Sequence, residues 1–109
     1  MEKVRLGRTN LEVTRLGWGS IPIQRVSEED AVAVIKAVVE MGVDVIDTAR
    51  SYTTSEGRIG LALNDWRRPV VLSSKSPIRT DKIYSDVQTT LKNLRVEKIP
   101  IYHLHNVAK

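Results

Sequence analysis

The sequence lacks cysteine altogether, and aromatic residues make up only 5% of its 109 residues. Without cysteine there is no disulfide, no thiolate zinc site and no cysteine nucleophile, which fits a reducing cytoplasm. Basic residues are in excess, with a formal net charge of +4, but they are scattered rather than interleaved with aromatic side chains along one stripe. The longest apolar run, residues 31–35, is far too short to span a bilayer. We therefore expect a cytoplasmic protein that binds neither nucleic acid nor membrane.

What the sequence does contain is an alternation of short apolar runs and helical patterns. Apolar runs predict strands at residues 15–18, 43–46, 70–72 and 99–104. Ser27 and Ser55 are expected to cap the first and second intervening helices, and Thr80-Asp81 to open the third. Gly42 is a natural end for the first helix because glycine enters the left-handed region at little cost.

The order of these elements predicts an α/β protein with a parallel sheet. Residues 1–14 alternate around a turn at 7–10, which predicts an N-terminal β-hairpin. Strands alternating with helices then imply parallel neighbours joined by right-handed crossovers. Four such strands are half of an eight-stranded barrel, which usually takes about 250 residues. We expect residues 15–109 to be the N-terminal half of such a barrel, paired either with a missing half or with a second copy.

Each of the four apolar runs leads into polar residues. Ser20 follows the first run, Asp47 the second (with Tyr52 just beyond), Lys75 the third and His105 the fourth. Because the carboxyl ends of parallel strands share one rim, and ligands bind at that rim, these side chains are expected to surround one site.

Residues 47–63 read Asp-Thr-Ala-Arg-Ser-Tyr-Thr-Thr-Ser-Glu-Gly-Arg-Ile-Gly-Leu-Ala-Leu, which resembles the signature of the aldo-keto reductase family. Four other segments are similar to family motifs in the same order: Leu-Gly-Arg-Thr-Asn-Leu-Glu-Val at 6–13, Leu-Gly-Trp-Gly-Ser at 16–20, Ser-Ser-Lys at 73–75 and Tyr-His-Leu-His at 102–105. The resemblance implies a (β/α)8 TIM-barrel fold, of which this chain carries the hairpin, four strands and three helices. It also implies NADP(H)-dependent reduction of an aldehyde or ketone to an alcohol.

The chemistry of these residues agrees with that expectation. Carbonyl reduction by hydride needs a proton donor for the oxygen on which charge develops. An ordinary phenol, with a pKa of about 10, is a poor donor at neutral pH, and a nearby ammonium group stabilises the phenolate. By the resemblance, Tyr52 is the general acid, Lys75 the cation that tunes it, Asp47 the partner of the lysine and His105 the group that orients the carbonyl.

Further positions follow from the same resemblance. Gly19, Ser20 and Asp47 match positions near the nicotinamide end of the cofactor, and Trp18 and His105 are candidates for a substrate pocket. Trp18 is equally well explained as a core residue. No metal site is expected, because the two histidines lack a neighbouring carboxylate.

Each of the four catalytic candidates also has a purely structural alternative: a turn aspartate, a packing tyrosine, a solvated lysine and a hydrogen-bonded histidine. One departure from the family is that Thr53 stands where a glycine commonly follows the tyrosine. The alternative function is that of a non-catalytic, truncated or accessory protein related to these reductases.

Overall fold

The computed structural model describes residues 1–77 and 81–107. A two-stranded antiparallel hairpin, β1 (Lys3–Arg5) and β2 (Glu12–Thr14), precedes a four-stranded sheet. The strands of that sheet, β3 (Trp18–Gly19), β4 (Val45–Asp47), β5 (Val71–Pro77) and β6 (Ile101–His105), are all parallel and lie in sequence order. The predicted parallel α/β architecture is therefore confirmed.

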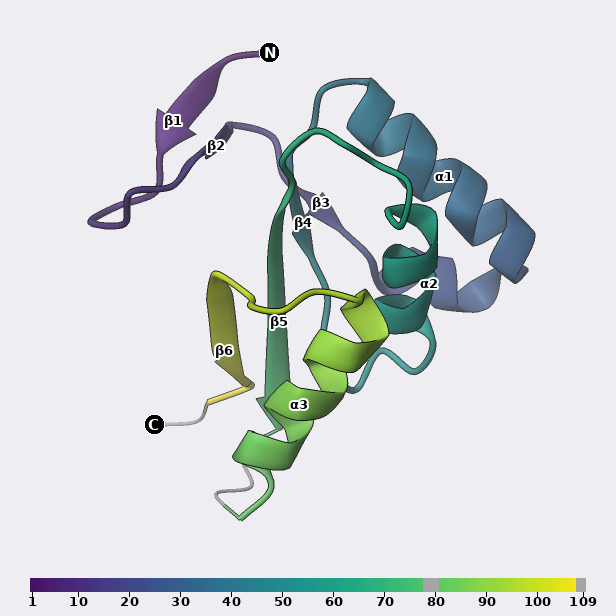
Figure 1. The fold of residues 1–109 in the computed structure, drawn as a ribbon, viewed down its shortest axis with the longest axis vertical. Helices are drawn as coiled ribbons and strands as arrows, with labels where there is room; N and C mark the ends of the chain where they lie inside the picture. Colours follow the sequence, from purple (N-terminus) through teal and green to yellow (C-terminus); the bar gives the residue numbers. More distant parts are fainter. Residues whose placement is uncertain (78–80, 108–109) are drawn as a thin grey trace.

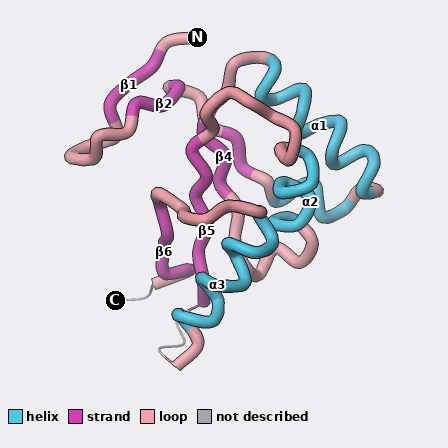
Figure 2. The backbone as a smooth tube through the Cα atoms, viewed as in Figure 1, coloured by secondary structure: helices cyan, strands magenta, loops and turns pink. Residues whose placement is uncertain are grey.

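Three α-helices cover one face of this sheet, as Figure 1 shows. They are α1 (Glu28–Glu40), α2 (Ser55–Ala62) and α3 (Ile83–Leu94), and a short 3₁₀ helix, η1 (Ile21–Arg25), follows β3. Helix α2 packs against both α1 and α3. Figure 2 shows the resulting two layers, with the strands in magenta and the helices in cyan on one side.

The core lies between the helices and the sheet. Ile35 of α1, Ile46 of β4 and Ile59 of α2 are completely buried and belong to one apolar cluster. Burying an isoleucine side chain fully contributes roughly 1.5–3 kcal/mol. Since side chains alternate along a strand, burying Ile46 on the helix face turns Asp47 to the opposite face of the sheet.

Helix α1 begins and ends as the sequence predicts. The Ser27 side chain accepts a hydrogen bond from the backbone N–H of Asp30, which is the usual N-cap contact. At the other end, Gly42 has a φ of +100°, a conformation that glycine adopts without steric cost.

Asp44 fastens the hairpin to the sheet. Its carboxylate accepts a hydrogen bond of 2.7 Å from the Thr14 backbone N–H and forms a 2.9 Å ion pair with Lys3. Partial burial opposes ionisation of Asp44, but the hydrogen bonds from Lys3 and Thr14 outweigh it and hold its pKa below the ordinary value of 3.8.

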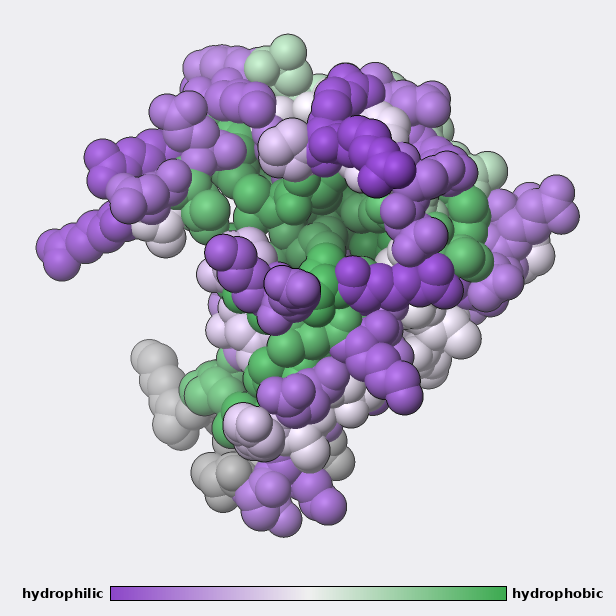
Figure 3. All heavy atoms as spheres, in the orientation of Figure 1, coloured by the Kyte–Doolittle hydropathy of each residue, from purple (hydrophilic) through white to green (hydrophobic). Residues whose placement is uncertain are grey.

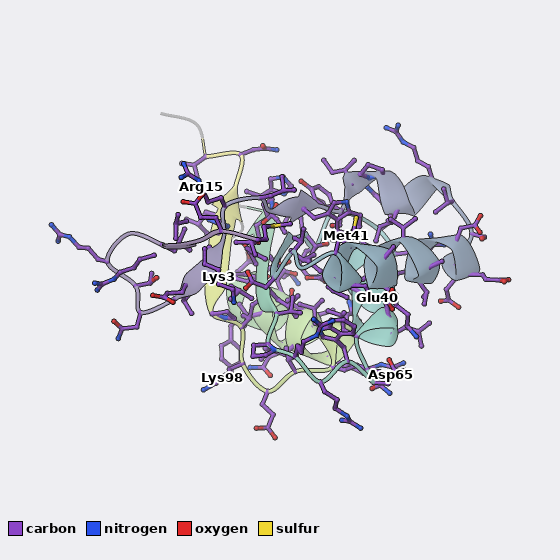
Figure 4. All side chains as sticks on the ribbon, turned by 90° about the horizontal axis from the view of Figure 1, so that it is seen from above. Lys3, Arg15, Glu40, Met41, Asp65 and Lys98 are labelled. Carbon is purple, nitrogen blue, oxygen red and sulfur yellow. The ribbon has the colours of Figure 1, made fainter. Side chains whose placement is uncertain are left out.

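The amino end of the sheet faces the viewer in Figure 4, where Lys3 and Arg15 mark the hairpin and Met41, Asp65 and Lys98 mark the segments after the three helices. A cavity of about 260 Å³ lies at this end, lined by residues that include Val39, Val43 and Trp66. In Figure 3 apolar side chains show in the hollow between the hairpin and the segment that leads into β5. Asp47, Tyr52, Lys75 and His105 do not line this cavity, so it is separate from the predicted rim.

Several predicted boundaries are wrong, and the first strand differs most. The run at 15–18 was expected to be a strand, but the Arg15 N–H donates to the Glu2 carbonyl and so extends the hairpin, while only Trp18 and Gly19 pair with β4. β5 is longer than predicted because the serines and Lys75 belong to the strand itself. The expected opening of the third helix at Thr80 lies outside the described residues, and α3 begins at Ile83.

The predicted capping role of Ser55 is also wrong. Thr54 occupies the N-cap position of α2, with no side-chain cap contact, and Ser55 is the first residue of the helix. The Ser55 hydroxyl is fully buried and donates to the Ser20 hydroxyl at 2.8 Å, with the Thr48 hydroxyl at the same distance. The serine thus links the helix to the ends of two strands.

Candidate active site

The four predicted catalytic residues come together at the carboxyl end of the sheet. Asp47 is the last residue of β4, Lys75 lies on the neighbouring β5, and His105 ends β6. Tyr52 lies in the loop between β4 and α2. Parallel pairing places these strand ends beside one another, although 58 positions separate the first and last residues in the sequence (Asp47 to His105).

Lys75 is the centre of this group. Its Nζ donates to Oδ2 of Asp47 at 2.5 Å and to the backbone carbonyl of Thr48 at 2.9 Å. The lysine side chain is 14% exposed, whereas the aspartate side chain is 44% exposed. A largely buried ammonium group with two fixed acceptors is held in one position, which a solvated surface lysine is not.

Tyr52 and His105 complete the group on the far side of the lysine. Nζ of Lys75 lies 5.4 Å from the centre of the Tyr52 ring. The rings of Tyr52 and His105 meet edge to face, with centroids 5.7 Å apart and planes at 83°. The Tyr52 ring therefore lies close to both the ammonium and the imidazole, and both rings are partly exposed.

Ser51, in the loop between β4 and α2, contacts this group directly. Its hydroxyl lies 3.2 Å from Nδ1 of His105. When that hydroxyl donates to Nδ1, the imidazole proton resides on Nε2, and Nε2 is free to donate to a ligand. Nothing in the strand pattern predicts this contact, because it joins the loop after β4 to the end of β6, which only the fold brings together.

Two of the predicted cofactor positions differ in accessibility: Gly19 is exposed and Ser20 is buried. Gly19 is exposed, and a Cβ built on it would meet no atom within 4 Å, so a flat group can approach its backbone. Ser20 is fully buried, and its hydroxyl donates to the Asp47 carbonyl at 2.8 Å. The Ser20 hydroxyl thus holds the backbone at Asp47, and the three cofactor-binding roles stay predictions.

Trp18 lies apart from the four residues. It is paired in the sheet with the fully buried Ile46 and packs against the apolar cluster under the helices. This environment is that of a core residue, which was one of the two roles that the sequence allowed. Its contribution to a substrate pocket stays a prediction.

Thr53 follows the tyrosine with a positive φ. Its φ is +37°, in the region where β-branched residues are strained. The Thr53 hydroxyl donates to Oε1 of Gln24 in η1 at 3.0 Å, which ties the Tyr52 loop to the segment after β3. Where the family motif has a flexible glycine, this chain therefore has a threonine whose side chain makes a specific hydrogen bond.

His103 does not join the site group. It pairs with Lys75 in the sheet and is exposed, with Nδ1 3.4 Å from the Ser73 hydroxyl. Across residues 1–77 and 81–107, no cluster of three or more histidine, aspartate or glutamate side chains is arranged to hold a metal ion. Within the same ranges no helix is long and apolar enough to cross a membrane.

Comparisons with known proteins agree with this arrangement. The family model described as Aldo/keto reductase family matches residues 14–109. L-galactose dehydrogenase of Arabidopsis thaliana is 25% identical over 94% of this chain and 37% of its own length. Aldo-keto reductase YhdN of Bacillus subtilis is 26% identical over 96% of this chain and 38% of its own length.

A solved structure shows the same fold. The aldo-keto reductase AKR11C1 from Bacillus halodurans, in its holo form, superposes with a TM-score of 0.85 and 27% identity over 95% of this chain and 40% of that one. The chain therefore spans about two fifths of the length of the relatives that it matches. With the signature segment, the parallel sheet and the clustered rim residues in agreement, the chain belongs to the aldo/keto reductase family.

Proposed function

We propose that this chain supplies the proton-transfer residues of an NADP(H)-dependent reductase that converts an aldehyde or ketone to an alcohol. The single observation that supports this function best is the contact of Lys75 with Asp47 on one side and with the Tyr52 ring on the other. Membership of an oxidoreductase family makes a nicotinamide cofactor the expected hydride source. The preference for NADP over NAD comes from the family resemblance.

In this proposal each residue acts on a stated atom. The Tyr52 hydroxyl donates its proton to the carbonyl oxygen of the substrate as negative charge develops there. The Lys75 ammonium stabilises the phenolate that remains, and Asp47 holds the ammonium in position. His105, with its proton on Nε2, donates a hydrogen bond to the same carbonyl oxygen and orients it.

The rim residues fit a nicotinamide group. When bound, NADPH supplies a hydride to the carbonyl carbon, and together with the proton from Tyr52 this gives the alcohol. Gly19 leaves its backbone open to a flat ring, and Asp47 is 44% exposed beside it in the sheet. Ser20 serves this end indirectly, through its hydrogen bond to the Asp47 carbonyl.

The test compares wild-type and Tyr52→Phe forms of the natural gene product. Carbonyl-dependent NADPH oxidation is followed by absorbance, and NADPH binding by fluorescence titration. Loss of a general acid typically costs 10²- to 10⁴-fold in kcat, so we expect a drop of about that size with NADPH affinity unchanged. Equal kcat values for the two forms would refute the assignment of Tyr52.

The alternative is an accessory or truncated relative without catalysis, and the span of about two fifths of the relatives is compatible with it. The purified 109-residue chain distinguishes the two. Absence of both NADPH binding and carbonyl-dependent oxidation would exclude autonomous catalysis and leave two arrangements: pairing with a second half-barrel, or an accessory role. In each case the proposed location is the cytoplasm, in keeping with the lack of cysteine.

A further inference from the structure

A buried carboxylate lies directly behind the site, on the helix face of the sheet. Glu56, in the first turn of α2, is 1% exposed, and the proposed chemistry does not use it. A buried carboxylate is costly unless it is paired and hydrogen-bonded. This one has four partner residues, which come from three different segments of the chain.

Both oxygens of Glu56 are occupied. Oε1 accepts from the Arg50 guanidinium at 2.6 Å and from the Asn93 amide at 3.3 Å. Oε2 accepts from the hydroxyl of Ser74 at 2.7 Å and from that of Thr90 at 2.6 Å. One carboxylate therefore joins the loop after β4, strand β5 and helix α3.

These partners are sequence neighbours of the proposed catalytic residues. Ser74 precedes Lys75 on β5, and because side chains alternate along a strand, Ser74 points to Glu56 while Lys75 points to the site. Arg50 lies two positions before Tyr52, and its backbone N–H donates to the Lys75 carbonyl at 2.9 Å. Glu56 thus anchors two segments: strand β5 next to Lys75, through Ser74, and the loop that carries Tyr52, through Arg50.

The connection reaches the strand of His105 as well. The Thr90 hydroxyl lies 3.2 Å from the hydroxyl of Tyr102 on β6. Burial raises the pKa of Tyr102 above its ordinary value of 10, while hydrogen bonds with Thr90 and Ser76 oppose that shift. At neutral pH the phenol is therefore uncharged and serves this network as a hydrogen-bonding group.

Arg50 makes the arrangement sensitive to the charge of Glu56. Its side chain is 24% exposed, and its Nε is buried without a hydrogen-bond partner within the described part of the chain. The ion pair with Glu56, at 2.6 Å, ties this guanidinium to helix α2. If Glu56 lost its charge, the arginine would be drawn towards water and would carry the Tyr52 loop with it.

We infer that Glu56 is a positioning residue for the active site, which holds Lys75 and Tyr52 in contact through Ser74 and Arg50. This role rests on the proposed function, in which the Lys75–Tyr52 geometry serves proton transfer. It concerns a group on the opposite face of the sheet from the substrate. Glu56 acts through its neighbours and does not touch the reacting atoms.

The test is an NMR comparison of the isotopically labelled 109-residue chain with its Glu56→Gln variant. Gln has nearly the same shape as Glu but no charge. Two signatures report the site: the ring-to-ring NOE between Tyr52 and His105, and the ring-current shift of the Lys75 side-chain methylene protons near the Tyr52 ring. The matched control is Glu40→Gln, at an exposed position at the far end of the sheet (Figure 4).

We expect Glu56→Gln to lose the NOE and to move the Lys75 protons towards their random-coil shifts, while amide signals of α1 and the hairpin stay in place. Glu40→Gln should change neither signature. Unchanged signatures in Glu56→Gln, or equal disturbance of α1 and the hairpin, would overturn the inference.

If Glu56→Gln does not fold, Ser74→Ala provides the decisive measurement, because it removes one hydroxyl donor and keeps the ion pair with Arg50. A shift of the Lys75 protons in folded Ser74→Ala supports the inference, and unchanged Lys75 protons overturn it. These readouts need neither cofactor nor turnover. An inactive but well-ordered site would therefore refute the proposed function and leave the role of Glu56 intact.

Discussion

Two glycines in helix α2 provide a sharp test of how this helix packs. A Cβ added to Gly60 would overlap the backbone carbonyl oxygen of Asn93 and lie 3.0 Å from two backbone atoms of Leu94. A Cβ added to Gly57, one turn earlier in the same helix, would meet no atom within 4 Å. The same substitution by alanine is thus expected to have opposite effects at the two positions.

The magnitudes follow from the contacts. In a helix interior alanine is favoured over glycine by about 1 kcal/mol, and this gain applies at both positions. At Gly60 the obstacle is the backbone of α3, which cannot rotate away as a side chain can, so we take the upper end of the usual overpacking cost, about 3 kcal/mol. Gly60→Ala should therefore lose about 2 kcal/mol of unfolding free energy, and Gly57→Ala should gain up to about 1 kcal/mol.

The assay is urea denaturation of the three proteins, followed by far-UV circular dichroism and by the fluorescence of Trp18 and Trp66. Equal slopes of free energy against urea would show that the variants differ in stability rather than in the compactness of the unfolded state. If Gly60→Ala proved as stable as Gly57→Ala, the close approach of α2 to α3 would be refuted. The buried position of Glu56 between these helices would then be in doubt as well.

Two further predictions concern the hairpin and the histidine. The pKa of Asp44 is lower in the folded chain than its ordinary value of 3.8, so the folded state binds fewer protons, and the stabilisation is present above that value and lost as the pH falls through the folded pKa. Asp44→Asn should flatten the acid side of a plot of urea midpoint against pH between about pH 5 and pH 3, and an unchanged slope would contradict this account. Ser51→Ala should reduce the preference of neutral His105 for the tautomer with its proton on Nε2, measured by ¹⁵N chemical shifts. Ser85→Ala on α3 is the control, and identical tautomer ratios in wild-type and Ser51→Ala chains would show that the Ser51 contact does not matter.

Much of the architecture was predictable because it depends on local patterns. The cap at Ser27 and the stop at Gly42 mark α1, and both work through backbone groups within a few residues. The alternation of strands and helices predicts parallel neighbours without knowledge of any long-range contact. The strand boundaries were less accurate, since a short run such as 15–18 does not reveal which partner its backbone will bond.

The sequence predicted which residues gather at the site, but only some of the contacts between them. The strand ends at Asp47, Lys75 and His105 share a rim because parallel strands do, and the family signature supplied Tyr52. The direction of the Ser20 hydroxyl was not predictable, because it depends on the Asp47 carbonyl, 27 positions away in sequence. The roles of the four residues in catalysis remain predictions that the kinetic test addresses.

The sequence by itself determined the class of fold, the order of its elements and the residues gathered at the rim. These features depend on the spacing of apolar residues and on the residue types at turns and caps, which act over short distances along the chain. Only the tertiary structure decided how those residues are held. The hydrogen bonds that unite Glu56 with Arg50, Ser74 and Thr90 join segments up to 34 positions apart. A buried charge selects its partners by position in space, and that position exists only once helices and sheet have packed.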